Sequence, residues 1–170
     1  TLDFTIPSRH LGLHMGEESP ITAEKIEALA LSIIEHIDMK RLLEIAATSS
    51  SPAPEEIKPL HDAAPKMRLA VARDKAFCFY YEDNLDIFQS FGAEIGFFSP
   101  LEDDRLPANI GGIYLGGGYP ELYGKELSCN QPLLEEIKRW AEDSKPIYAE
   151  CGGFMYLTEG ITDLDGQFHK

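Results

Sequence analysis

The sequence predicts an α/β fold, in which a mostly parallel sheet is covered by helices on both faces and preceded by a short helical segment. Three observations support this prediction. Short apolar segments alternate with amphipathic ones between residues 67 and 150, as in parallel strands joined by helices. Glycine-rich turns directly follow two of the apolar segments. Between residues 20 and 45, apolar residues recur every three or four positions, which is typical of one helix face.

Two helices are expected before residue 49. Ser19 is the expected N-cap of the first, and Pro20 is tolerated at its first position. Asp38 has the same capping chemistry and predicts a second, shorter helix. Both helices carry an apolar stripe that needs a partner surface. The stripe consists of Ile26, Leu29, Ala30, Ile33, Ile34, Ile37, Leu42, Leu43 and Ile45.

Residues 49–65 contain three serines and four prolines, a composition that resists regular packing, and we interpret them as a linker. Beyond it, residues 66–170 form the predicted α/β domain. Its strands are expected at 67–72, 95–98, 110–115 and 146–150. One helix is expected to be capped by Asp83 and closed by Gly92, with Leu85, Phe88 and Phe91 inward. Another is expected from 132 to about 142, with an inward side formed by Leu133, Leu134, Ile137 and either Trp140 or Ala141.

Three segments fall at the carboxyl ends of these strands, where parallel sheets bind ligands: 73–75, 116–121 and 151–153. The last places Cys151 between a strand and a helix that begins with two glycines, which is the layout of a nucleophile elbow. The helix N-terminus would favour the thiolate, and its N–H groups would face an oxyanion. A buried, inert thiol at a strand end is the alternative interpretation.

The triple glycine at 116–118 favours the catalytic interpretation, because it reads as a flexible turn at the same sheet edge with N–H groups for an oxyanion. A tight turn without function would look the same. We expect Cys78, which has aromatic neighbours, and Cys129, in a polar turn, to be structural. No metal site is expected, since no Cys-x-x-Cys pair occurs and His10 and His14 lie in an irregular stretch.

Composition restricts the partners. Fifteen Lys+Arg against 29 Asp+Glu give a formal charge of −14, which disfavours nucleic acids and anionic membrane surfaces. No apolar run approaches the roughly 18 to 20 residues of a bilayer span, and no charged-then-apolar leader opens the chain. Three cysteines, an odd number, fit reduced thiols better than a disulfide framework. We therefore expect a cytoplasmic protein.

Three strings, taken in order, resemble the class I glutamine amidotransferase domain of the cobyrinic acid a,c-diamide synthases of cobalamin biosynthesis, which implies a flavodoxin-like sheet. They are ARDKAFCFYYEDNL (72–85), GGGYPEL (116–122) and YAECGGFMYL (148–157). PSRHLGL (7–13) resembles, more loosely, the end of the ATP-binding synthetase domain that precedes it, so residues 1–48 are expected to be that domain's tail. The nickel-tetrapyrrole a,c-diamide synthases of methanogens share the signature.

In this family, an ATP- and magnesium-dependent domain activates two acetate side chains of a corrinoid, and the amidotransferase domain hydrolyses glutamine to supply ammonia. The resemblance implies that Cys151 is the nucleophile. It also implies an oxyanion hole formed by Gly117 or Gly118 with Gly152, and a glutamine pocket shaped by Tyr119 and Glu121. The residues suggested for a substrate or domain interface are Arg9, Arg73, Asp74 and Lys75.

The sequence departs from the family in two respects. The family's histidine, which lies well downstream of the cysteine, is not recognisable in the surroundings of His169. The phosphate-loop pattern Gly-x-x-x-x-Gly-Lys-[Ser/Thr] is also missing. We therefore expect an inactive piece, truncated at its C-terminus, of a carbon–nitrogen ligase whose ATP and Mg²⁺ sites lie elsewhere. Glutamine and, through the synthetase domain, a corrinoid are the expected partners, and a homodimer is compatible with the sequence.

Two other classes of function stay open. A stand-alone cysteine hydrolase or redox-sensing domain of the same fold would use Cys151 without a synthetase domain, although the match at residues 9–12 argues against it. A noncatalytic docking domain would leave Cys151 inert.

Overall fold

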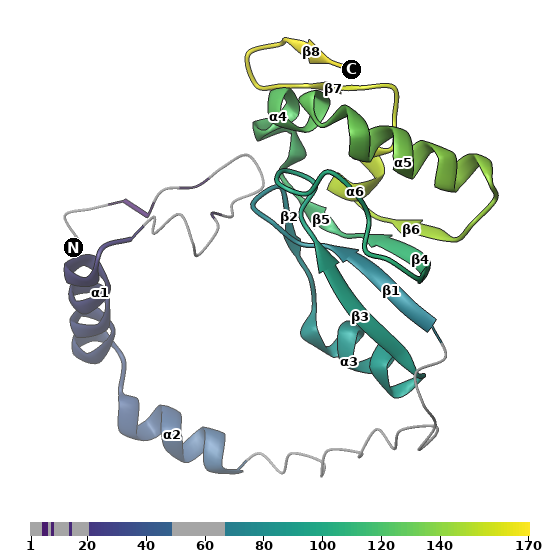
Figure 1. Cartoon of the computed structure of the whole chain (residues 1–170). Helices are drawn as coiled ribbons and strands as arrows, with labels where there is room; N and C mark the ends of the chain where they lie inside the picture. The colour runs from purple at the N-terminus through teal and green to yellow at the C-terminus, as the bar shows by residue number, and fades with distance from the viewer. Residues whose placement is uncertain (1–4, 7, 9–13, 15–20, 49–66) are drawn as a thin grey trace. The chain divides into compact units, whose positions relative to one another are not determined.

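Figure 1 shows the computed structural model of the protein, which describes residues 5–6, 8, 14, 21–48 and 67–170. The chain consists of two units, Thr1–Glu56 and Ile57–Lys170. Arg9, Ser19, Pro20 and the predicted linker at 49–65 lie outside the described residues.

The first unit contains α1 (Ala23–His36) and α2 (Met39–Thr48). The N-cap of α1 is Thr22, whose hydroxyl oxygen accepts a hydrogen bond from the Lys25 N–H at 3.4 Å. The prediction of Ser19 is wrong, because Thr22 supplies the same hydroxyl immediately before the first helical residue. Asp38 caps α2 as predicted, accepting from the Arg41 N–H at 2.9 Å. No described residue of either helix is buried, so the apolar stripe is exposed within this unit.

The second unit is built on a four-stranded sheet in the order β3-β1-β4-β6. All three neighbouring pairs are parallel, which confirms the predicted α/β class and gives the flavodoxin-like strand order. β1 is central, and its last four residues are buried, as expected for an apolar strand covered on both sides. The strands are β1 (Met67–Ala72), β3 (Ala93–Phe98), β4 (Ile110–Leu115) and β6 (Ile147–Ala149).

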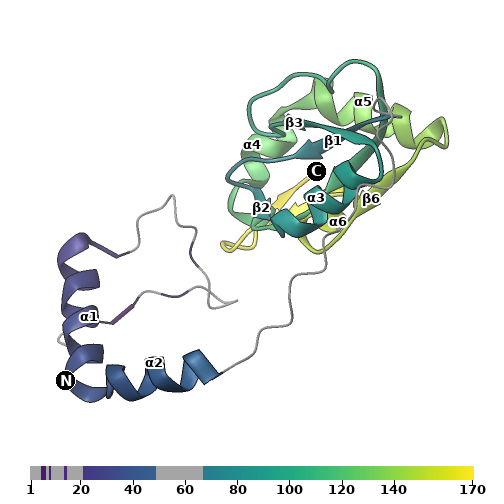
Figure 2. The same ribbon diagram turned by 90° about the horizontal axis from the view of Figure 1, so that it is seen from below.

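Helices cover the two faces of the sheet unequally. One face packs against α4 (Gly124–Cys129), α5 (Gln131–Glu142) and α6 (Gly152–Tyr156), which bury Leu127, Leu133, Ile137 and Tyr156 in the larger core. Within residues 67–170, the other face is covered by α3 (Glu82–Ser90) alone, through Leu85. Figure 2 shows α3 and α5 on opposite sides of the sheet. Because α3 is short, Phe97 and Tyr148 stay 49% and 57% exposed.

The details of α3 differ from the prediction. Tyr81 takes the N-cap position, so Asp83 is not the cap. Instead it lies in the first turn, where its charge complements the helix dipole. Phe91 is 61% exposed rather than inward, because the helix has already ended at the preceding residue. Gly92 follows with a positive φ of 92°, the conformation expected after a helix end.

Two predictions about later elements are resolved by the structure. In α5, Trp140 rather than Ala141 packs on the core, and its Nε1 donates to the Pro146 carbonyl oxygen at 3.1 Å. Cys129 ends α4 instead of lying in a turn. No helix in the described ranges is long and apolar enough to cross a membrane.

Apart from a strand expected just before Lys170, the sequence predicts none of the shortest strands or the 3₁₀ helix. β2 (Phe77–Phe79) pairs antiparallel with β5 (Gly117–Gly118), and a 3₁₀ helix follows at Pro120–Leu122. Near the C-terminus, β7 (Ile161–Thr162) and β8 (Phe168–His169) form an antiparallel hairpin that contacts α4. These pairs are too short for an alternating apolar pattern to appear in the sequence.

Candidate active site at the cysteine turn

Cys151 lies between β6 and α6, at the carboxyl edge of the sheet, as predicted. Its backbone has φ 48° and ψ −117°, a conformation that residues with a Cβ rarely adopt. The thiol-bearing residue is exposed. A strained, exposed residue between a strand and a helix is the geometry of a nucleophile elbow, so the structure supports the geometric part of the prediction.

Backbone hydrogen bonds hold this turn on both sides. The Glu150 N–H donates to the Leu115 carbonyl oxygen at 3.0 Å, which extends the β4–β6 pairing up to the cysteine. The Gly153 N–H donates to the carbonyl oxygens of Gly116 (2.8 Å) and Glu150 (2.9 Å). A Cβ at Gly153 would overlap the Leu115 backbone, so this position accepts only glycine. The strained conformation is therefore fixed by its neighbours.

The triple glycine is partly a strand and not a flexible turn, which corrects the prediction. Gly117 and Gly118 form β5 and pair with β2. The physical reason is close approach: a Cβ at Gly118 would overlap the Ala76 carbonyl oxygen, so two glycines allow the chains to meet backbone to backbone. A Cβ built on Gly117 would lie 3.6 Å from the Cβ of Cys151, which places Gly117 beside the cysteine.

The predicted oxyanion donors differ in their availability. Gly152 is the first residue of α6, where backbone N–H groups have no intrahelical partner. The Gly153 N–H is already used by two carbonyl oxygens. In the β2–β5 ladder, Gly118 pairs with Phe77 and Gly117 pairs with Phe79. The two differ in position, because Gly118 lies against Gly152 whereas Gly117 lies beside Cys151. Gly117 and Gly152, which flank the cysteine, are thus the better-placed pair.

The two residues predicted to shape a glutamine pocket are both buried. Tyr119 is 0% exposed, and its ring contacts that of Phe79 edge-on at a centroid distance of 5.2 Å. Glu121 is 9% exposed in the 3₁₀ helix that follows. Pro120, between them, lies against Gly152. Neither side chain therefore lies on an open surface.

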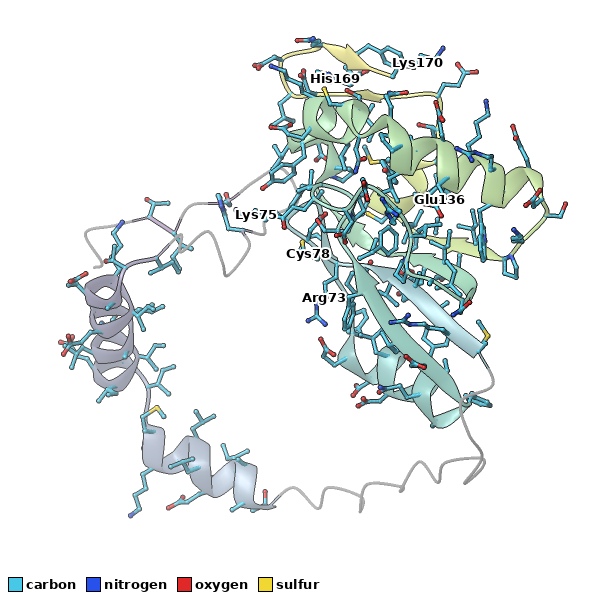
Figure 3. All side chains as sticks on the ribbon, in the orientation of Figure 1. Arg73, Lys75, Cys78, Glu136, His169 and Lys170 are labelled. Atoms are coloured by element: carbon cyan, nitrogen blue, oxygen red, sulfur yellow. The ribbon has the colours of Figure 1, made fainter. Side chains whose placement is uncertain are left out.

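The residues of the 73–75 loop have separate environments. Asp74 organises the loop: its carboxylate accepts hydrogen bonds from the N–H groups of Ala76 (2.8 Å), Phe77 (3.1 Å) and Leu101 (2.9 Å) and from the Ser99 hydroxyl (2.9 Å). Arg73 forms an ion pair with Glu82 at 2.9 Å and stacks on Phe97. Lys75 is exposed, and Figure 3 shows it projecting from the loop.

The remaining cysteines are positioned differently from Cys151. Cys78 lies on β2 and is half-buried, whereas Cys129 is exposed at the end of α4. Neither lies at a strand-to-helix turn. None of these three cysteines, all of which lie in the described part of the chain, forms a disulfide.

His169 belongs to the C-terminal hairpin, as Figure 3 shows. Its Nε2 lies 2.7 Å from Asp163 Oδ2, and its ring packs against Gly124 of α4. The hydrogen bond from His169 lowers the pKa of the Asp163 carboxyl, with help from the Gln167 N–H. The Cys151 thiol has no hydrogen-bond partner among the described residues, so none of them is in place as its base.

A group of four residues beneath the cysteine turn was not singled out from the sequence. Glu150 accepts hydrogen bonds from the hydroxyl groups of Tyr114 (2.7 Å) and Tyr148 (3.3 Å), and Tyr80 packs on Tyr114. Burial raises the pKa of Tyr80 and Tyr114, while the charge of Glu150 raises the pKa of Tyr148. The two strand tyrosines face each other because β4 and β6 pair in register, which no sequence pattern reveals.

Two cavities near α5 and α6 do not involve the cysteine. The larger, of about 640 Å³, lies along α5 and is lined by Leu134, Ile137, Ile147 and Tyr156 among others. The smaller, of about 50 Å³, lies between α4 and the C-terminal hairpin. Among the described residues, no group of three or more His, Cys, Asp or Glu side chains is arranged to hold a metal ion.

The fold and the turn define the class of α/β proteins that carry a cysteine at a nucleophile elbow. The CobB/CobQ-like glutamine amidotransferase domain family matches residues 68–170. The chain belongs to this family. The matched range coincides with the described α/β unit and contains all three sheet-edge segments predicted from the sequence.

Several curated relatives carry the name cobyrinate a,c-diamide synthase. The protein of Dehalococcoides mccartyi (strain CBDB1) is 48% identical over 167 residues, covering 96% of this chain and 36% of the relative. That of Synechocystis is 43% identical over 166 residues (97% and 34%), and that of Clostridium tetani is 43% identical over 160 residues (94% and 35%). The chain thus spans about a third of these relatives' length. No solved structure matches the chain significantly.

Proposed function

We propose that the chain is the glutamine-hydrolysing part of an ATP-dependent cobyrinic acid a,c-diamide synthase. The full enzyme would be a ligase that uses glutamine as the amide donor for the a and c acetate carboxylates of a corrinoid. The observation that carries this proposal is the strained turn at Cys151, with Gly117 beside it, in a chain whose relatives bear that enzyme's name.

In the proposed reaction, Cys151 Sγ attacks the side-chain amide carbon of glutamine, and a thioester forms as the carbon–nitrogen bond breaks. The thiol proton passes to a base and then to the leaving nitrogen, which departs as ammonia. Water hydrolyses the thioester to glutamate and regenerates the thiol. The described residues supply the nucleophile, while the base belongs to a part of the enzyme outside them.

Backbone donors would stabilise the oxyanion that develops on the amide oxygen. We assign this role to the N–H groups of Gly117 and Gly152, which flank Cys151, with Gly118 as the alternative to Gly117. Tyr119 and Glu121 would shape the glutamine pocket from behind, since both are buried next to the glycine segment. The position of Pro120 against Gly152 supports this arrangement.

ATP, Mg²⁺ and the corrinoid enter this proposal only as ligands of another part of the enzyme. The residues of this chain do not fit a nucleotide, because no phosphate-loop pattern occurs in it and its charge of −14 repels phosphate at long range. Arg9, Arg73, Asp74 and Lys75 are proposed to face the corrinoid or the synthetase domain. We expect the enzyme in the cytoplasm, without nucleic-acid or membrane partners, and a homodimer fits the proposal.

The test is covalent labelling of the full-length enzyme, which extends past Lys170 and includes the base, with a diazo-ketone analogue of glutamine, followed by peptide mass spectrometry. We expect modification of Cys151 that glutamine competes away. Cys129 is the matched control because it is also exposed, and Cys78 is a half-buried reference. Iodoacetamide, which needs only an accessible thiolate, serves as the comparison reagent.

Each alternative gives a different result in this test. Equal labelling of Cys129, or labelling that survives Cys151→Ser, contradicts the amidotransferase proposal. A redox-sensing or general hydrolase domain would react at Cys151 without competition from glutamine, and a docking domain would not react selectively at all. Assays of the full-length enzyme with cobalt- and nickel-containing tetrapyrroles distinguish the two synthases.

A further inference from the structure

The residue immediately before the proposed nucleophile is held by its side chain as well as by its backbone. The two carboxylate oxygens of Glu150 accept from different strands: Oε1 from the Tyr114 hydroxyl on β4 at 2.7 Å, and Oε2 from the Tyr148 hydroxyl on β6 at 3.3 Å. Hydrogen bonds to a carboxylate are among the stronger ones in proteins. Glu150 therefore ties the ends of β4 and β6 together directly beneath Cys151.

Tyr80 extends this connection to the central strand. Its hydroxyl donates to the Ala72 carbonyl oxygen at the end of β1 and accepts from the Gly116 N–H at 2.8 Å. Its ring meets the Tyr114 ring edge-on, with centroids 5.2 Å apart, and Tyr114 meets Tyr148 at 5.3 Å. Three neighbouring strand ends are thereby linked through aromatic rings and one carboxylate.

Such a connection matters because Cys151 is strained. A residue held in a sparsely populated backbone conformation keeps it only when its surroundings over-determine it. On the α6 side, the Gly153 N–H supplies this restraint through Gly116 and Glu150. On the β6 side, Glu150 is the last residue before the turn, and it is fixed by the Leu115 carbonyl and the two tyrosine hydroxyls.

We propose that Glu150 is a positioning residue for Cys151: its carboxylate, held by Tyr114 and Tyr148, sets the direction in which the thiol leaves the sheet edge. The proposal rests on the proposed glutamine hydrolysis at Cys151. Glu150 takes no proton and touches no reacting atom; its hydrogen bonds direct the carboxylate towards β4 and β6. The hydrogen bond from Tyr114 is the shorter of the two, and Tyr114 is only 2% exposed. This hydrogen bond therefore restrains Glu150 more than the hydrogen bond from Tyr148 does.

The geometry distinguishes Glu150→Gln from Glu150→Ala. A glutamine has the same shape, so its carbonyl oxygen still accepts from Tyr114 while the charge is removed. An alanine removes both hydrogen bonds and releases the residue before the turn. A positioning role therefore predicts that Glu150→Gln retains function and Glu150→Ala does not.

The experiment measures two rate constants at Cys151 in the full-length enzyme, one with the diazo-ketone glutamine analogue and one with iodoacetamide. The analogue reacts only when the thiol is correctly oriented, whereas iodoacetamide reports thiolate accessibility alone. We expect Glu150→Ala to slow the analogue about tenfold or more and to leave iodoacetamide within about twofold, since small displacements of a reacting group reduce rates strongly. Glu150→Gln should stay within about threefold of wild type for both.

The control is Glu142→Ala, because Glu142 is an exposed glutamate at the end of α5 with only a 3.9 Å contact to Lys138. It should change neither rate. If Glu150→Ala does not fold, Tyr114→Phe and Tyr148→Phe decide: the first should slow the analogue selectively and more than the second.

The outcomes separate this proposal from the proposed function. If wild-type Cys151 does not react selectively with the analogue, glutamine hydrolysis itself is wrong. If wild type reacts selectively but Glu150→Ala reacts equally fast, the positioning role is wrong and the function stands. An equal loss of analogue reactivity in Glu150→Gln and Glu150→Ala also overturns the proposal, because the effect would then come from the charge of Glu150 and not from its hydrogen bonds.

Discussion

Replacing Cys151 with glycine should make the protein more stable, whereas replacing it with alanine should not. The backbone at this residue has φ 48° and ψ −117°, where a Cβ is strained and glycine is not. Such strain costs about 1–3 kcal/mol, and the greater freedom of glycine in the unfolded chain offsets about 0.5–1 kcal/mol of the relief. We therefore expect Cys151→Gly to exceed Cys151→Ala by about 1–2 kcal/mol in free energy of unfolding.

The assay is urea and thermal unfolding of the two variants under reducing conditions. Alanine is the control because it also removes the sulfur but keeps the Cβ, so the difference isolates the backbone strain. Each kcal/mol gained in free energy of unfolding corresponds to a rise in melting temperature of roughly 2–8 °C. If Cys151→Gly is no more stable than Cys151→Ala, the turn is not strained and the elbow interpretation loses its physical basis.

Three further predictions follow from the same region and the C-terminal hairpin. Gly153→Ala should destabilise the protein by about 3 kcal/mol or more in chemical unfolding, because its Cβ would overlap the Leu115 backbone; a change below about 1 kcal/mol would contradict this. Glu150→Gln should lower the pH at which Tyr148 ionises in an ultraviolet titration, since the Glu150 charge holds the Tyr148 pKa up; an unchanged titration would mean that the two groups are not in contact. The pKa of Asp163 is lowered on folding, so its stabilising contribution is present above its unfolded value and lost as pH falls through the folded one. The difference in unfolding midpoint between wild type and Asp163→Asn should therefore shrink as the pH falls below the ordinary aspartate pKa of about 3.9, and a constant difference would refute the pairing.

Much of the α/β unit could be predicted from the sequence because its strands are continuous apolar runs. The segments at 67–72 and 110–115 match β1 and β4 to the residue. Their chemistry is local: a strand covered on both faces is mostly apolar, and its end is marked by charged residues after 67–72 and by glycines after 110–115. The same reasoning placed Cys151 at the strand-to-helix turn.

Contacts between distant segments could not be predicted in this way. The pairing of β2 with β5 depends on the Gly118 backbone meeting Ala76, and nothing near either residue signals the other. The Glu150 cluster likewise arises from the register of β4 with β6. In α3, the carboxylate of Asp83 resembled a cap, but the helix begins at Glu82, after Tyr81 at the N-cap position, where no side chain forms a capping hydrogen bond.

The contact between Gly118 and Ala76 couples the movement of β5 to that of the loop before β2. With no side chain between them, neither backbone can shift without carrying the other along. The Asp74 carboxylate anchors the loop that holds Ala76, through two of its own N–H groups and through Ser99 and Leu101 beyond β3. A displacement that began at this carboxylate, far from the cysteine in sequence, would pass through Ala76 to Gly118, which directly follows the glycine beside Cys151.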